Sequence, residues 1–324
     1  MERKTMSELM KDKPFLYMCA PMVRYSKLAF RTLVRRYNCD LCFTPMIISE
    51  SFVKSQKARD IEFMTNSGDQ PLIVQFAASN GKDFADAAEL VAPYVQGVDL
   101  NCGCPQRWAM AEGYGAWLID HPELISDAIK MTKARVNSDF TVSIKIRIHS
   151  DLRKTVDMCQ MAEHAGISFL TVHGRTARQR AEPVDIEAIR TIKDSVNIPV
   201  FANGDVRSVE DAQMFREKTR VDGVMAARGM LQNPAMYAGY SETPLCCVQD
   251  WVDLAMDLGT PFLCFHHHLI QMLEQVTGKA EKKVFNVLTS TAGLLDHLEE
   301  NYGIAYDPQR LVNGHVQNTD DLTR

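Results

Sequence analysis

A cysteine in a short segment with glycine and proline is the residue best suited to move a proton. Cys104 lies in Asn101–Pro105, directly after an apolar run. A thiol with an ordinary pKa of about 8.5 is mostly protonated at neutral pH, so it can act as a general acid. The glycine-rich stretch Glu112–Gly115 follows shortly afterwards. We therefore interpret this segment as a mobile loop that carries an acid, although a single cysteine can also be a small buried hydrophobe.

The other cysteines indicate a reduced protein without a metal site. Cys39 with Cys42, and Cys102 with Cys104, are close enough in sequence to suggest zinc ligands. Neither pair has a suitably spaced partner pair, so we expect no bound metal. Nine cysteines are an odd number for a disulfide framework, and most lie in apolar runs. This usage is typical of an intracellular protein, and we expect a cytoplasmic one.

Three polar residues lie within or at the end of apolar runs and could contact a bound ring. Lys145 interrupts Val142–Ile146 and could neutralise electron density on a reduced flavin. A structural lysine paired with a carboxylate is the alternative. Gln75, inside Leu72–Phe76, needs hydrogen-bond partners and could pair with the edge of the same ring. His173 ends another apolar run but carries little weight alone.

Two later segments could hold a phosphate group. Gly204 follows one apolar run, and Ala227-Arg228-Gly229 follows the next. Glycine lets backbone amides approach an anion closely, and arginine adds a forked cation. Tight turns that need glycine for conformational reasons are the alternative. Because barrel enzymes often bind phosphate after their seventh and eighth strands, we favour a phosphate site.

Eight apolar runs alternate with amphipathic helical stretches, and these elements must position the residues above. Eight such units favour a closed (β/α)8 TIM barrel over an open sheet. All strands except the second end in polar or Gly/Pro-rich sequence, at the face where barrels build their sites. The expected strands are 15–19, 41–44, 72–76, 98–101, 142–146, 169–172, 200–202 and 223–226. The expected helices are 28–37, 83–95, 122–136, 155–165, 185–195 and 209–216.

After Tyr240 the pattern changes to helices alone. We expect them at 248–258, 262–276 and 279–300. The chain therefore divides into a barrel at 1–240, a small all-α helical domain at 241–304 and a disordered polar tail at 305–324. The doublet Cys246–Cys247 and the run His266–His268 are expected to be packing and helix-surface residues.

Charge and hydropathy exclude several classes of protein. The 324 residues carry a formal net charge of −5, which argues against a wholly basic nucleic-acid binder but allows a local basic patch. There is no run of about 18 apolar residues, so we expect no membrane span. The charged N-terminus lacks the apolar core of a secretory signal. We expect a monomer.

Taken in order, these strand ends resemble the tRNA-dihydrouridine synthase family over nearly the whole chain, to about Ile304. The segment Asn101–Gln106 is similar to the family's N-x-G-C-P signature. Through Cys102–Met110 and Asp250–Asp253 the chain is most similar to the fourth eukaryotic class, which modifies uridines 20a and 20b in the tRNA D-loop. The other matching segments are Ala20–Val23, Ile144–Arg147, Val172–Thr176 and Ala202–Asp205.

The resemblance implies an FMN-dependent reduction of uridine to 5,6-dihydrouridine in tRNA, with NADPH as the reductant. Hydride would reach uracil C6, and Cys104 would protonate C5 from the opposite face. Asn101 would hold the uracil, with Arg147 and Arg175 near the uracil or the tRNA backbone. The residues expected to contact FMN are Pro21, Met22, Val23, Gln75, Lys145, His173, Asn203, Gly204, Asp205, Ala227 and Arg228.

Basic residues for a tRNA groove occur in two parts of the chain. The eight basic residues are Arg24, Lys27, Arg31, Arg35, Arg36, Lys279, Lys282 and Lys283. For the three lysines, an ordinary solvated helix face is the alternative.

Three rival functions stay open. The first is an FMN barrel that acts on a free pyrimidine, similar to dihydroorotate dehydrogenase. The second is a catalytically silent tRNA-binding flavoprotein. Trp117 favours this second rival, because we expect a small residue after Gly113–Ala116 and an indole there either crowds the Cys104 loop or packs outward. The third is a phosphate-binding isomerase without flavin.

Overall fold

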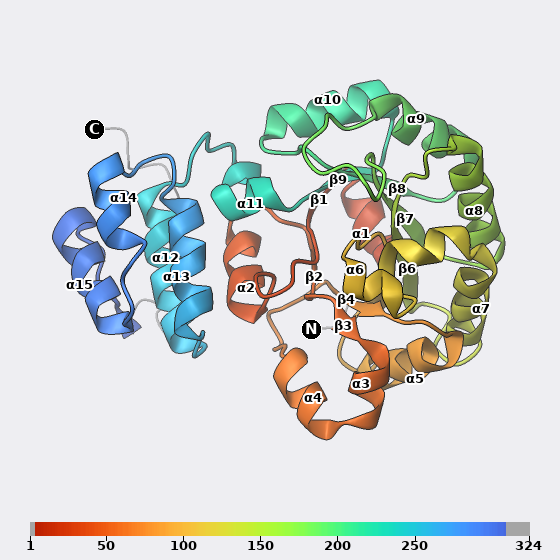
Figure 1. Cartoon of the computed structure of the whole chain (residues 1–324), viewed down its shortest axis with the longest axis horizontal. Helices are drawn as coiled ribbons and strands as arrows, with labels where there is room; N and C mark the ends of the chain where they lie inside the picture. Colours follow the sequence, from red (N-terminus) through yellow and green to blue (C-terminus); the bar gives the residue numbers. More distant parts are fainter. Residues whose placement is uncertain (1–3, 309–324) are drawn as a thin grey trace.

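Eight parallel strands close into a barrel in the computed structural model, which describes residues 4–308 (Figure 1). The ring runs β2-β1-β9-β8-β7-β6-β5-β4 and closes where β2 pairs with β4, which confirms the predicted TIM barrel. A two-residue strand, β3 (Ile47–Ile48), lies along the end of β4. The barrel strands are β1 (Leu16–Cys19), β2 (Leu41–Phe43), β4 (Leu72–Ala77), β5 (Gly97–Cys102), β6 (Thr141–Arg147), β7 (Phe169–His173), β8 (Val200–Asn203) and β9 (Gly223–Ala226).

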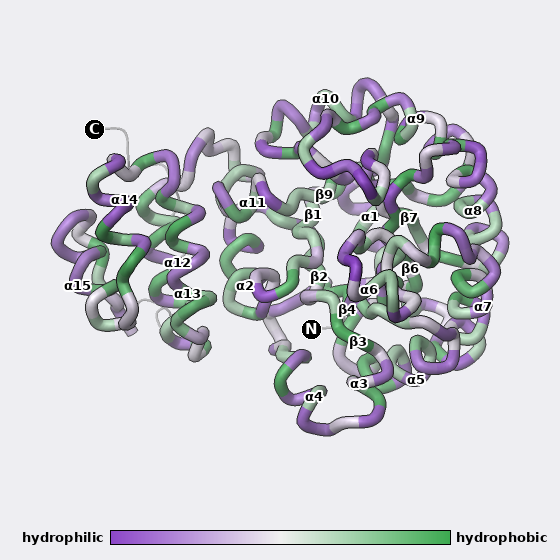
Figure 2. The backbone as a smooth tube through the Cα atoms, viewed as in Figure 1, coloured by the Kyte–Doolittle hydropathy of each residue, from purple (hydrophilic) through white to green (hydrophobic). Residues whose placement is uncertain are grey.

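Amphipathic helices surround the barrel, with their hydrophobic sides against the strands (Figure 2). The predicted helices agree with the structure to within a few residues. They are α2 (Leu28–Arg36), α5 (Gly81–Val91), α7 (Pro122–Lys133), α8 (Leu152–His164), α9 (Ile186–Ser195) and α10 (Val209–Thr219).

Several short helices have too few turns to show a period in the sequence, and they were not predicted. The first, α1 (Met6–Asp12), packs Met6 and Leu9 against the inward-facing apolar residues of the barrel. The others are α3 (Ser49–Lys54), α4 (Gln56–Glu62), α6 (Arg107–Ala111), α11 (Arg228–Gln232) and the 3-10 helices η1 (Gly115–Asp120) and η2 (Met236–Ala238).

The chain after η2 is helical, and it lies beside α2 and α11 (Figure 1). Its helices are α12 (Leu245–Asp257), α13 (Phe262–Met272), α14 (Lys279–Phe285) and α15 (Thr291–Tyr302). The prediction of one helix over 279–300 is wrong. Ser290 starts a new helix, because its side chain accepts a hydrogen bond from the Gly293 amide and caps α15.

The predicted tail at 305–324 lies mostly outside the described residues. Its first residues make contacts with α12. The Tyr306 hydroxyl donates to Asp257 at 2.6 Å, and the Asp307 amide donates to Asp253 at 3.0 Å. These two bonds attach residues 306 and 307 to α12.

Candidate functional site

Side chains from neighbouring strands form a continuous polar arc at the C-terminal end of the barrel. In the strand register Asn101 pairs with Lys145, and Arg147 pairs with His173. His173 in turn pairs with Asn203 on β8. Register partners on adjacent strands lie about 4.8 Å apart and point the same way. The closed sheet thus brings together residues that are about a hundred positions apart in sequence.

A chain of hydrogen bonds joins β6, β5 and β4 inside the barrel. Asp99 accepts from Ser143 Oγ at 2.7 Å and from Gln75 Nε2 at 2.8 Å. Gln75 Oε1 then accepts from Asn101 Nδ2 at 2.8 Å. All four residues are buried, so each of these bonds replaces water that the polar groups have lost. The chain holds the side-chain amides of Gln75 and Asn101 in fixed orientations.

The same network reaches the loop that carries Cys104. Asn101 Oδ1 accepts from the backbone amides of Gly103 at 3.1 Å and Cys104 at 2.9 Å. On the other side, the Ala116 amide donates to Cys104 O at 3.0 Å. Gly115 has φ +65°, and a Cβ there would lie 2.5 Å from Cys104 O. Only glycine therefore allows the downstream chain to pack so closely on Cys104, whose side chain stays partly exposed.

Trp117 packs beside this loop in the outer layer of the barrel. Its indole stacks on the His121 ring, with centroids 3.5 Å apart, and it packs against the hydrophobic core outside the strands. A Cβ on Gly113 would sit in ordinary contact with it at 3.6 Å. The bulky side chain is thus accommodated by stacking, which removes the crowding argument for an inactive protein.

Burial determines the charges at the barrel mouth. Burial, together with Arg147, lowers the pKa of Lys145 to about 8, and Asp99 opposes that shift. Burial also raises the pKa of Asp99 to about 6, with Lys145 opposing. Burial and the nearby cations lower the pKa of His173 to about 2, so its ring is neutral at neutral pH. The mouth therefore presents cationic and neutral donors that suit an electron-rich ring.

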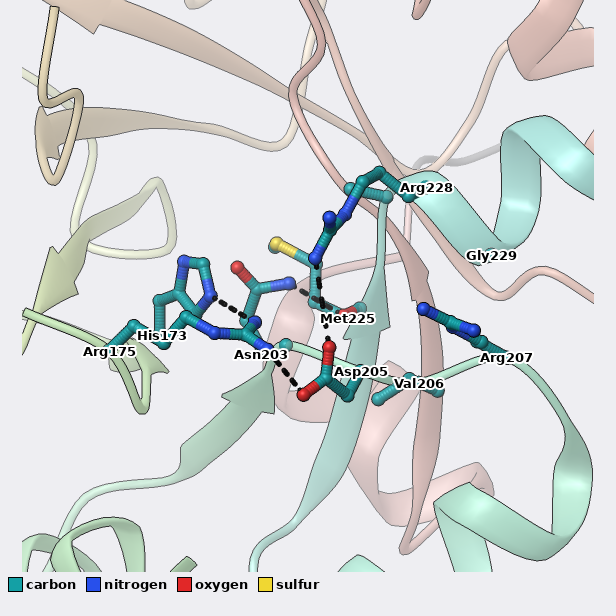
Figure 3. Close-up of a pocket in the computed structure, with 11 residues that line it drawn as sticks. His173, Arg175, Asn203, Asp205, Val206, Arg207, Met225, Arg228 and Gly229 are labelled. Carbon is teal, nitrogen blue, oxygen red and sulfur yellow. Dashed lines mark hydrogen bonds and ion pairs between the residues drawn. The ribbon is translucent and has the colours of Figure 1, made fainter. Parts of the chain in front are cut away.

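The loops after β8 and β9 enclose a pocket, to which β7 also contributes (Figure 3). Gly204 has φ +115°, and a Cβ there would lie 2.9 Å from the His173 ring. Asn203 Nδ2 donates to Met225 O at 2.8 Å and ties the two strands together. Glycine is required at 204 for both conformation and space. Five residues that the resemblance assigns to FMN, namely Asn203, Gly204, Asp205, Ala227 and Arg228, all line this pocket.

Arg175 supports the pocket from a buried position. Its guanidinium donates to Asp205 and to Glu182 O, each at 2.5 Å, and to His173 Nε2 at 3.3 Å. Figure 3 shows it between His173 and Asp205. Its side chain is only 2% exposed. These contacts fit a supporting role for Arg175, whereas Arg147 is half-buried and donates to Thr176 O at 2.9 Å.

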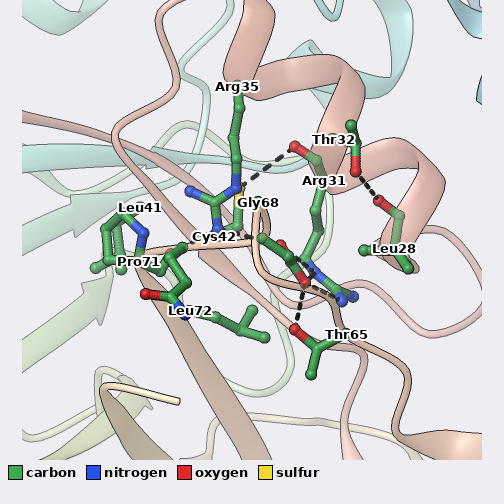
Figure 4. Close-up of polar contacts among 12 residues, drawn as sticks. Leu28, Arg31, Thr32, Arg35, Leu41, Cys42, Thr65, Gly68, Pro71 and Leu72 are labelled. Carbon is green, nitrogen blue, oxygen red and sulfur yellow. Dashed lines mark hydrogen bonds and ion pairs between the residues drawn. The ribbon is translucent and has the colours of Figure 1, made fainter. Parts of the chain in front are cut away.

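Two of the predicted tRNA contacts are wrong. Arg31 is buried and pairs with Asp69 at 2.6 Å, and Arg35 reaches the same carboxylate at 3.2 Å. Arg35 also donates to Pro71 O at 2.6 Å, in the cluster drawn in Figure 4. Both guanidiniums join α2 to the loop before β4, so neither can meet a phosphate backbone. In the sequence, an arginine whose partner is a buried carboxylate cannot be distinguished from a surface arginine, because both can occupy the same position on a helix.

Sequence reasoning missed Asp99 and Ser143. Both are polar residues that alternate with apolar ones along β5 and β6, and a polar side chain at such a position is the signal that could have identified them. Asp99 is two positions before Asn101, so both side chains face the barrel interior. Within residues 4–308, no group of three or more His, Cys, Asp or Glu is arranged to hold a metal ion. None of the helices in that range has the length and apolarity to cross a bilayer.

The chain is similar to several known proteins. Residues 18–302 match the family model described as dihydrouridine synthase. A human protein named tRNA-dihydrouridine(20a/20b) synthase-like, of the NAD(P)+ type, is 58% identical over 303 residues, which is 93% of this chain and 96% of that protein. The tRNA-dihydrouridine(20a/20b) synthase of Schizosaccharomyces pombe is 43% identical over 296 residues, covering 91% and 90%. The old yellow enzyme structure from Trypanosoma cruzi gives a TM-score of 0.51 at 12% identity over 67% of this chain and 85% of that one, a likeness of fold alone.

Proposed function

Because the chain belongs to the dihydrouridine synthase family, we propose that it reduces uridine to 5,6-dihydrouridine in the tRNA D-loop, at positions 20a and 20b. One structural observation carries this proposal. Asn101 links the Cys104 backbone to Gln75, so the acid loop and the inner wall of the barrel are held in one network. Such a link orients a proton donor relative to the wall that would hold the hydride donor, and orientation of reacting groups lowers the barrier.

We propose FMN as the resident cofactor. The pocket between the loops after β8 and β9 suits its phosphate, because Gly204 opens the backbone and Arg228 and Arg207 line the wall. Gln75, Lys145 and His173 would contact its ring. Pro21, Met22 and Val23 would lie beside the same ring. Bound there, FMN would supply the hydride for uracil C6 after reduction by NADPH.

The chain's own residues supply the proton and the orientation. Cys104 donates its Sγ proton to uracil C5. Asn101 would orient the base, and its bonds to Gln75 and to the Cys104 loop, which fix its amide, support this role. Lys145 provides positive charge within the mouth, and Arg147 is the guanidinium that we assign to the uracil or its phosphate. Arg175 acts indirectly, by holding Asp205 and His173.

A uridine must leave its stack to enter the barrel mouth, which costs a few kcal/mol in a paired helix and less in a loop. We propose that residues 241–304 bind the tRNA body and that recognition depends on shape and backbone. Lys279, Lys282 and Lys283 on α14 would meet phosphates. The presence of this domain favours tRNA over a free pyrimidine as the substrate, because a small substrate needs no additional domain to bind it.

The test is turnover on unmodified tRNA. The purified protein should show the visible spectrum of oxidised flavin and should form dihydrouridine with NADPH, measured by mass spectrometry of tRNA digests. Activity on free uracil or orotate without RNA would support the free-pyrimidine rival. A coloured protein that binds tRNA without turnover would be the silent flavoprotein, and a colourless protein would favour the isomerase.

A further inference from the structure

The loop between β1 and α2 contains the residues assigned to one side of the flavin ring, and it has an unusual backbone. Arg24 adopts φ +73°, a left-handed conformation that costs a non-glycine residue about 1 kcal/mol or more. Within the loop, the Tyr25 and Ser26 amides both donate to Met22 O at 3.0 Å. The Met22 amide donates to Ser26 Oγ at 2.9 Å. Such a loop keeps its shape only if its surroundings hold it.

Three consecutive carbonyls of this loop accept hydrogen bonds from side chains of helices. Cys264 Sγ donates to Arg24 O at 3.1 Å, and His268 Nε2 donates to Tyr25 O at 3.2 Å. Arg31 Nη1 donates to Ser26 O at 2.7 Å. Cys264 and His268 are four residues apart and therefore share one face of α13. That helix belongs to the region after the barrel, so the two parts of the chain meet at this loop.

His268 is the best-defined of these contacts. It is fully buried, and its ring stacks on Phe30 with centroids 4.4 Å apart. Burial lowers its pKa to about 3, so the ring is neutral at neutral pH. A carbonyl can only accept, so the ring proton sits on Nε2 and Nδ1 is a bare acceptor. In the described part of the chain Nδ1 has no hydrogen-bond partner.

A buried acceptor without a partner destabilises a protein by about 1–3 kcal/mol. An apolar side chain of similar size would fill the space between Phe30 and Trp251 without that cost. The feature that only the imidazole supplies here is the Nε2–H bond to Tyr25 O. The sequence alone predicts packing and helix-surface residues at His266–His268, and packing explains the ring of His268 but not this donor.

We propose that His268, with Cys264, is a positioning residue that ties the loop over residues 20–26 to α13 and thereby sets the backbone beside the flavin ring. The link to the flavin rests on the proposed function, whereas the link to the loop stands on geometry. It follows that the helical region after the barrel both flanks the tRNA and holds one side of the cofactor site.

The test is amide hydrogen exchange of the apoprotein, followed by FMN titration. His268→Leu should speed exchange of the amides of residues 22–27 by about threefold to tenfold, the effect of one hydrogen bond, while α12 and α15 exchange as before. The same variant should weaken FMN binding by a similar factor and shift its long-wavelength absorption band. His268→Gln, which keeps an N–H at the same reach, should restore both. His267→Leu, on the exposed side of α13, is the matched control.

A packing role alone predicts a different result. Unchanged exchange of residues 22–27 in folded His268→Leu would overturn the proposal. If that variant does not fold, Cys264→Ala decides instead, because it removes the bond to Arg24 O, and unchanged loop exchange in it would have the same consequence. Wild-type protein that takes up no FMN would refute the proposed function, whereas the apoprotein exchange result would still decide this inference.

Discussion

Asn101 joins Cys104 to Gln75 through the two ends of one amide. Its Oδ1 accepts from the Cys104 backbone N–H at 2.9 Å, and its Nδ2 donates to Gln75 Oε1 at 2.8 Å. The Cys104 backbone and the Gln75 side chain in the barrel wall are thereby fixed relative to each other.

Asn101→Asp should break the link between the Cys104 loop and Gln75. The carboxylate can still accept from the Cys104 amide, but it cannot donate to Gln75 Oε1, and it places two acceptors face to face. We expect kcat for dihydrouridine formation to fall by about tenfold to a hundredfold, the effect of one unpaired buried polar group. Circular dichroism and FMN titration should show a folded protein that binds its cofactor. Wild-type kcat in this variant would show that the link is not needed.

Cys104→Ala should separate the two halves of the reaction. Reduction of bound FMN by NADPH should continue, while dihydrouridine formation should fall by about two to four orders of magnitude, the usual contribution of a general acid. Stopped-flow absorbance measures the first step and tRNA digests measure the second. Cys246→Ala removes an exposed thiol on α12 and is the control. Normal dihydrouridine formation by the Cys104 variant would eliminate Cys104 as the acid.

Asp99→Asn should change how stability depends on pH. The folded pKa of Asp99 is raised from 3.8 to about 6, so its stabilising contribution is full below about pH 4 and is lost as the pH rises to 6. Two pKa units correspond to about 3 kcal/mol, the order of magnitude expected. As the pH rises from 4 to about 6, the free energy of unfolding of the variant should therefore increase relative to that of wild type, measured by urea unfolding.

The comparison with wild type isolates Asp99 from the other titrating groups. The pKa of His173 is lowered to about 2, so its contribution is lost as the pH falls below about 6.5 in both proteins. The pKa of Lys145 is lowered to about 8, and its contribution changes only between about pH 8 and 10.5. A stability difference that does not vary between pH 4 and about 6 would contradict the assignment.

Arg175→Lys should weaken FMN binding, although residue 175 is not expected to contact the flavin ring itself. An ammonium cannot reach Asp205, Glu182 O and His173 together, because only the planar guanidinium presents donors in that fork. We expect FMN affinity to fall at least tenfold, measured by fluorescence titration, and the thermal midpoint to fall by several degrees. Arg178→Lys, at an exposed position of the same loop, should leave both unchanged. Equal FMN affinity in the two variants would exclude this role.

Lys282→Glu combined with Lys283→Glu should weaken tRNA binding and reduce its dependence on salt. Each lost phosphate contact lowers the slope of log affinity against log salt concentration by about 0.7 to 0.9. Because Lys282 pairs with Glu274 at 2.9 Å, Lys283→Glu alone is the cleaner variant. Lys218→Glu, exposed on α10, is the charge-matched control. A salt titration that superposes on wild type would remove α14 from the tRNA interface.

The sequence by itself determined the barrel and the residues at its mouth. Apolar runs and helical periods are local properties, and eight of them in alternation leave few alternatives to a closed parallel sheet. Once the strand order is known, the carboxyl ends of all strands must meet at one face. The sequence therefore predicts that Cys104, Lys145 and Gly204 follow or end strands at the same face of the barrel.

Only the tertiary structure decided which polar groups are available and which are committed. Asp69 neutralises Arg31 across 38 positions, and Cys264 bonds Arg24 O across 240. Neither pairing has a local signature, because a hydrogen bond between distant segments depends on how helices pack around the barrel. The same holds for Arg175 and Asp205. Residue type and spacing predict which chemistry is possible, whereas long-range packing and burial determine which donors face the ligand.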